Sequence, residues 1–475
     1  MRCSFRKSFR LYGLLLTLAV FPISGNCFGT QPYDDDLIVA PKSAPYPIEE
    51  DLDPGSASAG IQPLVPLVSA TALNPPAAAP FEGALFERKA LTGDWGGART
   101  YLSDGGITAD LSTTQYYQGI ASGGLRQVFR YGGRNDYFVN VDGEKVGLWK
   151  GLFVSLHGES RYGETVDRLT GALMPTNLML DVPQAQGSVT ALTAVRLNQF
   201  LSEEFLVYGG RLNMFDTFAQ PITGATALNG FMNTAMMFNP VYGRTVPYST
   251  YGVGFAFLKD LQPVFSAAVI DTHNTPTVSG FNTLFDNGVT MLAVLNVPTQ
   301  YFGQLGHQGV SGTYSTGTYT NLEPIPYFDP ILGLGLAARK KTGSWSLTYN
   351  FDQALYTSPL NPEKVWGIFG NVGISDGNPN PVPTFFNLGL SGTSVIPNRL
   401  QDSCGFGFYY VKVSDSLKEL APNLLRIHDE QGVELYYNYE VNPWFHVTPD
   451  IQLISPFRER AETSVVAGLR AKIDF

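Results

Sequence analysis

The C-terminal end of the chain alternates between two kinds of residue, one position at a time. One series is Thr463, Val465, Ala467, Leu469, Ala471, Ile473 and Phe475, and the other is Ser464, Val466, Gly468, Arg470, Lys472 and Asp474. Neighbouring side chains of a β-strand point to opposite faces, so the pattern predicts a strand with one face suited to lipid and the other to water.

Four further segments upstream have the same two-residue period: residues 152–162, 345–352, 433–441 and 445–453. Only Asn442-Pro443-Trp444 connects the last two of these, whereas the connection from Ser455 to Glu462 is longer and charged. The residues Lys341-Thr342-Gly343 predict another tight turn before the 345–352 strand. Short periplasmic turns and longer outer loops are typical of outer-membrane barrels, so we expect the C-terminus and the Asn442 turn on the periplasmic side.

A soluble β-sandwich also alternates in this way, and it is the main competing fold. Charges such as Arg470 and Glu434 on the polar face suit a wet lumen, and aromatic residues such as Tyr437 and Trp444 suit an interfacial girdle. The chain also ends on an aromatic residue, Phe475, which is the residue type that the barrel-assembly machinery of outer membranes reads. The sequence therefore predicts an all-β fold, a transmembrane antiparallel β-barrel embedded in outer-membrane lipid.

The length of the alternating region sets the size of the barrel. At about 9–11 residues per strand plus loops, residues 87–475 accommodate roughly 16 strands, with 14 or 18 left open. A ring of about this size leaves an aqueous channel, whereas a ring of about eight strands is filled by side chains. Size therefore favours a pore.

The composition agrees with a barrel and narrows the range of partners. Charged residues make up 15% of the chain and aromatic residues 13%, and there are 50 glycines. Past the N-terminus there is no run of about 18 apolar residues, so internal transmembrane helices are not expected. The net charge is −10, and without a basic patch nucleic acid is excluded as a partner.

The N-terminus has the pattern of an export signal. Basic residues from Arg2 to Arg10 precede an apolar stretch from Leu11 to Ile23, and small or polar residues follow. We expect residues 1–29 to be a signal peptide. Cys27 fits a lipoprotein cleavage site poorly, and once the signal is removed Cys404 is the remaining thiol.

The next stretch, residues 30–86, is rich in Pro, Ala and acidic residues and cannot build a core. We expect a flexible acidic periplasmic segment ahead of a barrel domain at 87–475. Two roles are open for this segment, an extended tether and a contact with the cell wall.

Several motifs give the chain a family resemblance. The segment Leu91-Thr92-Gly93-Asp94-Trp95-Gly96-Gly97-Ala98-Arg99 resembles the opening signature of the OprB-type carbohydrate-selective porins. Residues 376–381 resemble a later family turn, and residues 432–452 and 466–470 resemble the C-terminal family block. The resemblance implies a 16-stranded barrel that passes glucose and related sugars by facilitated diffusion.

The residues of the opening motif allow two interpretations. Gly93, Gly96 and Gly97 permit backbone conformations that other residues resist. Trp95 would seal the periplasmic mouth or pack at the start of the barrel, and Asp94 and Arg99 would pair. We favour a structural cap on the first strand over direct contact with a solute.

Strand parity predicts which side chains line the pore. The candidates are Glu159, Arg161, Glu434, Tyr436, Asn438, Glu440, Arg470 and Lys472, joined by Arg196 and Arg211 on further expected strands. Residues 224–247 and 299–330 match no family motif and are expected to form long loops, which set selectivity. For each candidate, the alternative is an ordinary wall residue solvated by channel water.

Nothing in the sequence indicates catalysis, a cofactor or a metal site. The five histidines lack the spacing of metal ligands, and the Gly-rich stretch at 303–317 lacks the lysine of a phosphate-binding loop. Three functions stay open: a sugar porin, a general or ion-selective porin, and a structural barrel tethered to the cell wall. By analogy with general porins we expect a homotrimer.

Overall fold

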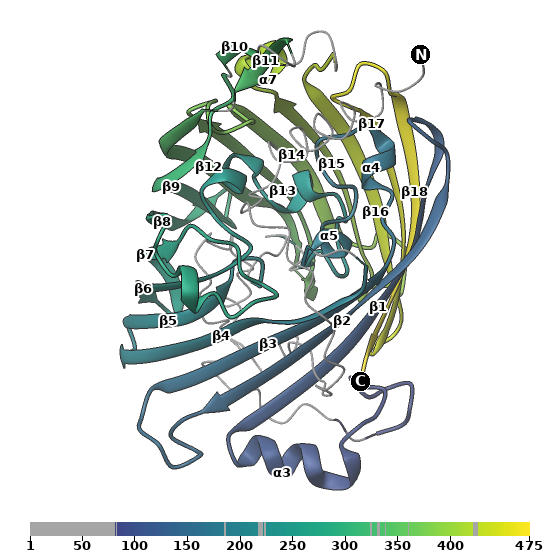
Figure 1. The fold of residues 1–475 in the computed structure, drawn as a ribbon. Helices are drawn as coiled ribbons and strands as arrows, with labels where there is room; N and C mark the ends of the chain where they lie inside the picture. The colour runs from purple at the N-terminus through teal and green to yellow at the C-terminus, as the bar shows by residue number, and fades with distance from the viewer. Residues whose placement is uncertain are drawn as a thin grey trace.

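The computed structural model describes residue 81 and residues 83–475, apart from residues 185–186, 217–221, 223–224, 324, 330–332, 338, 360 and 421–425. Within this part, sixteen strands form a closed antiparallel barrel (Figure 1). β1 (Ile107–Gly124) pairs with β18 (Glu462–Asp474) and so completes the ring. The predicted all-β fold and the expected strand number are both confirmed.

The other barrel strands run in chain order around the ring. They are β2 (Phe129–Asp142), β3 (Leu152–Gly163), β4 (Val189–Ser202), β5 (Phe205–Asn213), β6 (Ser249–Lys259), β7 (Gln262–Asp271), β8 (Val289–Tyr301), β9 (Gln304–Thr320), β12 (Lys340–Ser358), β13 (Asn361–Ser375), β14 (Thr384–Thr393), β15 (Ser403–Lys412), β16 (Glu430–Asn442) and β17 (Phe445–Ser455). Between β9 and β12 the chain forms a separate two-stranded sheet from β10 (Ile325–Asp329) and β11 (Gly333–Ala337).

The helical elements are all short. They are η1 (Trp95–Gly97), α3 (Ala98–Asp104), α4 (Asp167–Thr170), α5 (Leu178–Asp181), α6 (Thr234–Met237), η2 (Pro240–Arg244), η3 (Phe281–Thr283) and α7 (Asp415–Leu420). In the described part of the chain, no helix has the length and apolar character needed to cross a membrane.

The two ends of the barrel differ in the length of their connections. At one end β4–β5, β6–β7, β8–β9 and β16–β17 are joined by tight turns, and α3 and the C-terminus lie at this end (Figure 1). At the other end lie the long connections, including those that carry β10–β11 and α7. This is the asymmetry expected from the Asn442 turn and the Ser455 loop, and it identifies the periplasmic end as the one with α3.

Two local predictions were wrong. Lys341, Thr342 and Gly343 lie inside β12, where the pairing with β9 shifts register between Thr342 and Ser344, so the glycine marks a bulge and not a turn. Most of residues 299–330 belong to β9, although a long loop was expected there. Residues 224–247 do lie in a long connection, between β5 and β6.

The alternation along the strands separates an outer face from an inner face. On β16, Leu435 and Tyr439 are exposed, while Glu434, Tyr436 and Asn438 at the alternate positions are buried. The exposed series is apolar, as a lipid-facing surface requires. The parity predicted for the C-terminal strands is therefore confirmed.

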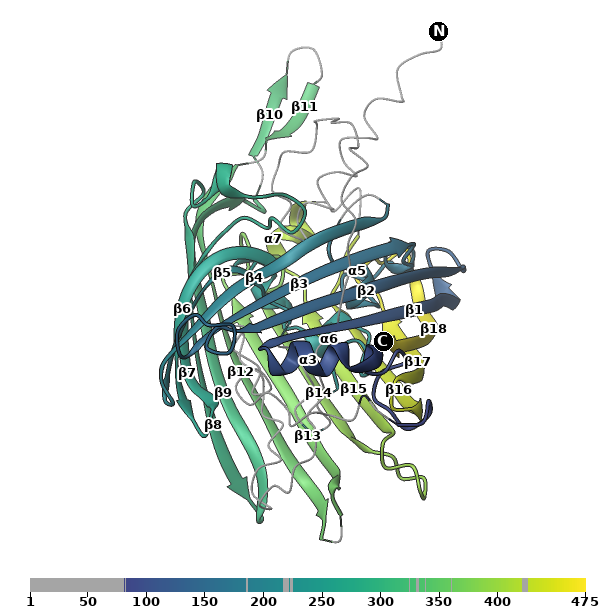
Figure 2. The ribbon, with the colours of Figure 1, turned by 90° about the horizontal axis from the view of Figure 1, so that it is seen from below.

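The interior of the ring is occupied by two connections from the long-loop end. We call the described residues of 164–188, between β3 and β4, loop A, and the described residues of 214–248, between β5 and β6, loop B. Figures 1 and 2 show α5 of loop A inside the ring of strands, and Figure 2 shows α6 of loop B there as well. A hydrophobic cluster joins loop A and loop B to inward-facing wall residues such as Tyr436 and Phe385. The ring is thus narrowed by packed loops, whereas the sequence predicted a hollow ring with wet inner positions.

Inward-facing glycines in β13 and β15 make room for loop B. A Cβ atom at Gly405 would lie 2.8 Å from the Phe231 ring of loop B and 2.6 Å from the Tyr436 ring. Both rings are fully buried, so neither has space to move away. The missing side chain at this position lets an aromatic residue of the loop reach the wall.

We predict that Gly405→Val destabilises the protein by about 1–3 kcal/mol, because the added side chain overpacks a filled interior. The midpoint of thermal unfolding of the purified barrel measures the effect. Gly312→Val is the matched control, since its Cβ would point outward with nothing closer than 3.6 Å. Equal midpoints for the two variants would show that loop B is not seated on the wall.

Candidate functional site

Three of the predicted pore-lining residues hold loop B. The Arg470 guanidinium donates hydrogen bonds to the carbonyl oxygens of Ala227 (3.1 Å) and Gly230 (2.8 Å). The Glu434 carboxylate accepts from the backbone N–H groups of Met232 and Asn233, the latter at 3.1 Å. The Tyr436 ring packs edge-on against Phe231 with centroids 4.7 Å apart.

These contacts have a common physical cause. The strands of a closed barrel use their own backbone groups to pair with their neighbours, so only side chains remain to bond an inserted loop. Buried backbone N–H and C=O groups need partners, and charged side chains form the stronger hydrogen bonds. Glu434 of β16 and Arg470 of β18 therefore bond the loop backbone and do not face open water.

Loop A is held in the same way, by residues of β3 and β16. Arg161 donates to the carbonyl oxygens of Pro183 (3.1 Å) and Gly187 (3.2 Å). Glu430, which was not among the candidates, accepts from the N–H groups of Leu173 and Met174. Within loop A, burial and then the neighbouring Asp167 carboxylate raise the pKa of Asp181 to about 7.

The remaining inward candidates lie nearer the periplasmic end. Lys472 bonds Asp474 at 2.5 Å, and Asn438 accepts from the Thr448 hydroxyl at 2.9 Å. Glu440 is half-buried near the end of β16. Arg196 points inward from β4, where it pairs across the sheet with Ser155. These residues do line the inner side of the wall.

The structure corrects the placement of Arg211. In the sheet register Arg211 lies between Val195 of β4 and Tyr251 of β6. Tyr251 is on the same face of β6 as the exposed Val253, so Arg211 is on the outer face of the barrel. The connection between β7 and β8 folds over it, and the guanidinium donates to the Ser279 carbonyl at 2.9 Å while lying 5.1 Å from the centre of the Tyr251 ring. Arg211 is therefore not a pore residue.

A polar cluster on β2 and β3 contains Glu159 together with residues that the sequence analysis did not select. Arg134 donates a hydrogen bond from Nε to Oδ1 of Asp136 at 2.8 Å, and it also bonds Glu159. His157 lies between Asp136 and Asp216 of loop B. All but Asp216 are buried. The signal available in the sequence was the i, i+2 spacing of Arg134 and Asp136, which places both on the inner face.

Ligand atoms of Asp136, His157 and Glu159 lie within 4.8 Å of one another, a spacing that would suit a metal ion. The Arg134 guanidinium already bonds both carboxylates and supplies the compensating charge. The arrangement fits an arginine-centred network better than a cation site.

Below this cluster, toward the periplasm, the inner wall reaches solvent. Asn140, Ser155 and Arg196 form one row across β2, β3 and β4. Asn140 and Ser155 are half-exposed, and Asp216 above them has 20% of its side chain exposed. Beside Asp216, the Phe215 ring is also partly exposed and packs 5.1 Å from the rings of both Phe238 and Tyr248. We call Asn140, Ser155, Phe215 and Asp216, together with the buried Arg196 beside Ser155, the open inner patch.

The opening motif lies at the seam where the ring closes. Arg99 donates to the backbone oxygen of Phe475 at 2.8 Å and to Gly93 O at 3.3 Å. Its guanidinium also lies 4.6 Å from the centre of the Trp95 ring. The Asp94 carboxylate bonds Thr100, not Arg99 as expected. Gly96 and Gly97 have φ values of 69° and 93°, which place the turn into α3. The geometry supports the structural cap, and it connects the motif to the last strand as well as the first.

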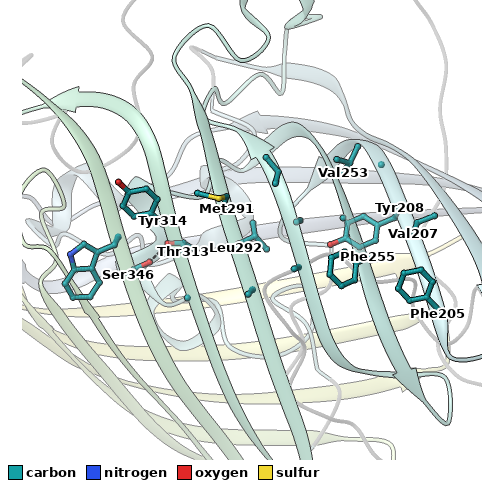
Figure 3. Close-up of a pocket in the computed structure, with 18 of the residues that line it drawn as sticks. Phe205, Val207, Tyr208, Val253, Phe255, Met291, Leu292, Thr313, Tyr314 and Ser346 are labelled. Carbon is teal, nitrogen blue, oxygen red and sulfur yellow. Dashed lines mark hydrogen bonds between the residues drawn. The ribbon is translucent and has the colours of Figure 1, made fainter.

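A hollow of about 1400 Å³ lies on the outer side of the wall over β5–β9 (Figure 3). Exposed apolar side chains, including Val253, Met291 and Tyr314, line it. Alanine and glycine at the centre, at Ala267, Ala293 and Gly312, make it concave. Because its lining faces outward and is apolar, this hollow suits lipid hydrocarbon and is not a path for polar solutes.

Comparisons with known proteins agree with this architecture. The sequence profile of the family described as "Carbohydrate-selective porin, OprB family" matches residues 126–475. Porin B of Pseudomonas aeruginosa is 23% identical over 430 residues, covering 82% of this chain and 91% of that one. The high-pH structure of Pseudomonas putida OprB has a TM-score of 0.71 at 21% identity and covers 83% of this chain and 100% of that one. The low-pH structure of the same protein has a TM-score of 0.51 at 19% identity and covers 82% and 99%.

We predict that Arg470→Met loosens loop B and lowers the free energy of unfolding by about 2–3 kcal/mol, because two buried carbonyl oxygens lose a charged donor. Limited proteolysis from the long-loop end should then cut loop B, which the parent protein protects. Arg426→Met, at a side chain that is 78% exposed, is the control and should change neither property. If loop B of Arg470→Met stays as resistant to proteolysis as in the parent protein, then Arg470 does not hold the loop.

We also predict that Arg99→Gln weakens the seam between β1 and β18, since Phe475, the residue after β18, loses its hydrogen bond to Arg99. The readout is the temperature at which the folded, fast-migrating gel band disappears, and it should fall by several degrees. The exposed Lys150→Met provides the control. If the folded band disappears at the same temperature in both variants, the opening motif does not stabilise the closure of the barrel.

Proposed function

This chain belongs to the OprB family of carbohydrate-selective porins, and we propose that it admits small neutral sugars, such as glucose, across the outer membrane into the periplasm by facilitated diffusion. The open inner patch is the observation that carries this proposal. It combines amide and hydroxyl groups of the inner wall with the carboxylate and the partly exposed Phe215 ring of loop B, inside a closed barrel.

The chemistry of the patch matches that of a sugar. A pyranose has many hydroxyl groups around an apolar ring face, so it exchanges hydrogen bonds with polar side chains and stacks on aromatic faces. Several soft contacts are better for transport than one tight site, because the solute must also leave. Asn140 and Ser155 on the wall and Asp216 of loop B offer such contacts.

The charge arrangement favours a neutral solute over an ion. On the inner wall Arg134 is in contact with Asp136 and Glu159, and Lys472 with Asp474. Opposite charges in contact leave a small field at the distance of a passing solute. An ion-selective or general porin is the second candidate, and the described residues give it less support. We infer transport without catalysis.

Three further parts of the proposal rest on the sequence. We propose export by the signal peptide at 1–29, recognition of Phe475 by the barrel-assembly machinery, and a periplasmic segment at 30–86 that acts as a tether or contacts the cell wall. Residues 1–80 lie outside the described part of the chain. A homotrimer in the outer membrane is the assembly we expect by analogy with general porins.

Two measurements on the purified full chain test the function. Liposomes that contain the protein should swell in glucose faster than in larger oligosaccharides, and planar bilayers in a salt gradient should give a reversal potential near zero. A strong cation or anion selectivity without sugar entry would favour the second candidate. Neither sugar entry nor conductance would end the porin proposal.

A pair of matched substitutions locates the path. Ser155→Trp places a bulky ring in the open inner patch and should reduce glucose-driven swelling several-fold. Val154→Trp, one residue away on the same strand, points outward to lipid and should leave swelling unchanged. Equal swelling in both variants would show that the path runs elsewhere in the barrel.

A further inference from the structure

His157 lies at the junction between the wall and loop B. Its Nδ1 is 2.6 Å from Oδ1 of Asp216 in loop B, and its Nε2 is 3.2 Å from Oδ1 of Asp136 on β2. The ring stacks on Phe138, with centroids 3.9 Å apart and planes 14° apart. The imidazole is thus fixed in its plane with a carboxylate at each nitrogen.

This geometry determines which form of the histidine fits. A neutral imidazole has one N–H donor and one acceptor nitrogen, whereas an imidazolium has two donors. An ionised carboxylate only accepts. Both contacts are satisfied when His157 is protonated, and loss of that proton leaves a nitrogen lone pair facing a carboxylate oxygen.

The other polar and charged groups near the His157 ring are bonded mainly to one another. From β2, Arg134 bonds both Asp136 and Glu159 and offsets one of their two negative charges, and Glu159 Oε1 is 3.7 Å from Nε2 of His157. From β5, the Asn213 amide bonds Thr193 and the Tyr248 hydroxyl at 3.1 Å each. Tyr248 itself donates to Glu159. From β4, the positive charge of Arg196 interacts with the carboxylate of Asp216.

We propose that His157 is a positioning residue that holds Asp216 in the open inner patch only while it is protonated, so that the sugar affinity of the pore decreases as the pH rises. The inference rests on the proposed function, because Asp216 matters to a solute only if sugars pass this patch. On deprotonation Nε2 keeps its proton, because it faces both Asp136 and Glu159, and the Nδ1 proton leaves to solvent. The contact with Asp216 is then lost, and the start of loop B separates from the wall.

The test measures how glucose blocks the ion current through single barrels in planar bilayers. In the parent protein the half-blocking concentration should rise about fivefold between about pH 5 and about pH 9, the effect of losing one charged hydrogen bond. His157→Gln should have the weak, high-pH value throughout. Asp216→Asn should also lose the pH response. If both variants keep the parent's pH response, the inference is overturned.

Two controls separate this effect from other titrations. His307→Gln removes a similar histidine–carboxylate pair, with Asp352, on another part of the wall. Asp181→Asn removes the loop A carboxyl whose pKa is raised to about 7 by burial and by Asp167. Both variants should keep the response, and its loss in either one would assign the switch to that residue and refute the role of His157.

The outcomes also distinguish this inference from the proposed function. A glucose block with the same strength at every pH leaves the sugar porin intact and removes only the switch. Conductance without any block by sugar removes the proposed function itself. A folded His157→Gln barrel is verified by its heat-modifiable gel mobility, and Asp216→Asn decides the question if that variant fails to fold.

Discussion

The structure depends on hydrogen bonds between charged side chains of the inner wall and the backbone of two inserted loops. Every barrel strand pairs with a neighbour on both sides, so the wall has no backbone groups to offer inward. The loops bring in many peptide groups that need partners away from bulk water. Arg470, Glu434, Arg161 and Glu430 supply those partners. Without them the loops would have to leave the ring, and the pore would widen.

This constraint explains the mixture of polar and apolar packing inside the barrel. Charged wall residues bond the loop backbone, while apolar loop side chains such as Phe231 and Met236 pack against wall aromatics and over inward glycines. One set of contacts fixes where the loop chain runs, and the other excludes water from between loop and wall. The open inner patch stays accessible to solvent, and its polar and aromatic groups are those that a sugar-selective pore needs.

The sequence was enough to predict the barrel, because alternation is a local property that each strand displays by itself. It also predicted that Glu434, Tyr436 and Arg470 face inward. It did not show what they meet there, since contacts of Arg470 with residues 227 and 230 join parts of the chain far apart. Arg211 was misplaced because a basic residue on an expected strand was taken to face water, whereas a folded connection covers it on the outer side. His157 was examined only for metal-ligand spacing, and its carboxylate partners come from β2 and from loop B.

Hydrogen–deuterium exchange of the full chain in a lipid bilayer tests the central claim most directly. The amides of Met232 and Asn233 in loop B, which bond the Glu434 carboxylate, should exchange as slowly as the amides of β16, because opening them requires breaking a buried charged bond. Exchange of these two amides at the rate of the exposed turn at residues 302–303 would contradict the account, since loop B would then not be held by the wall.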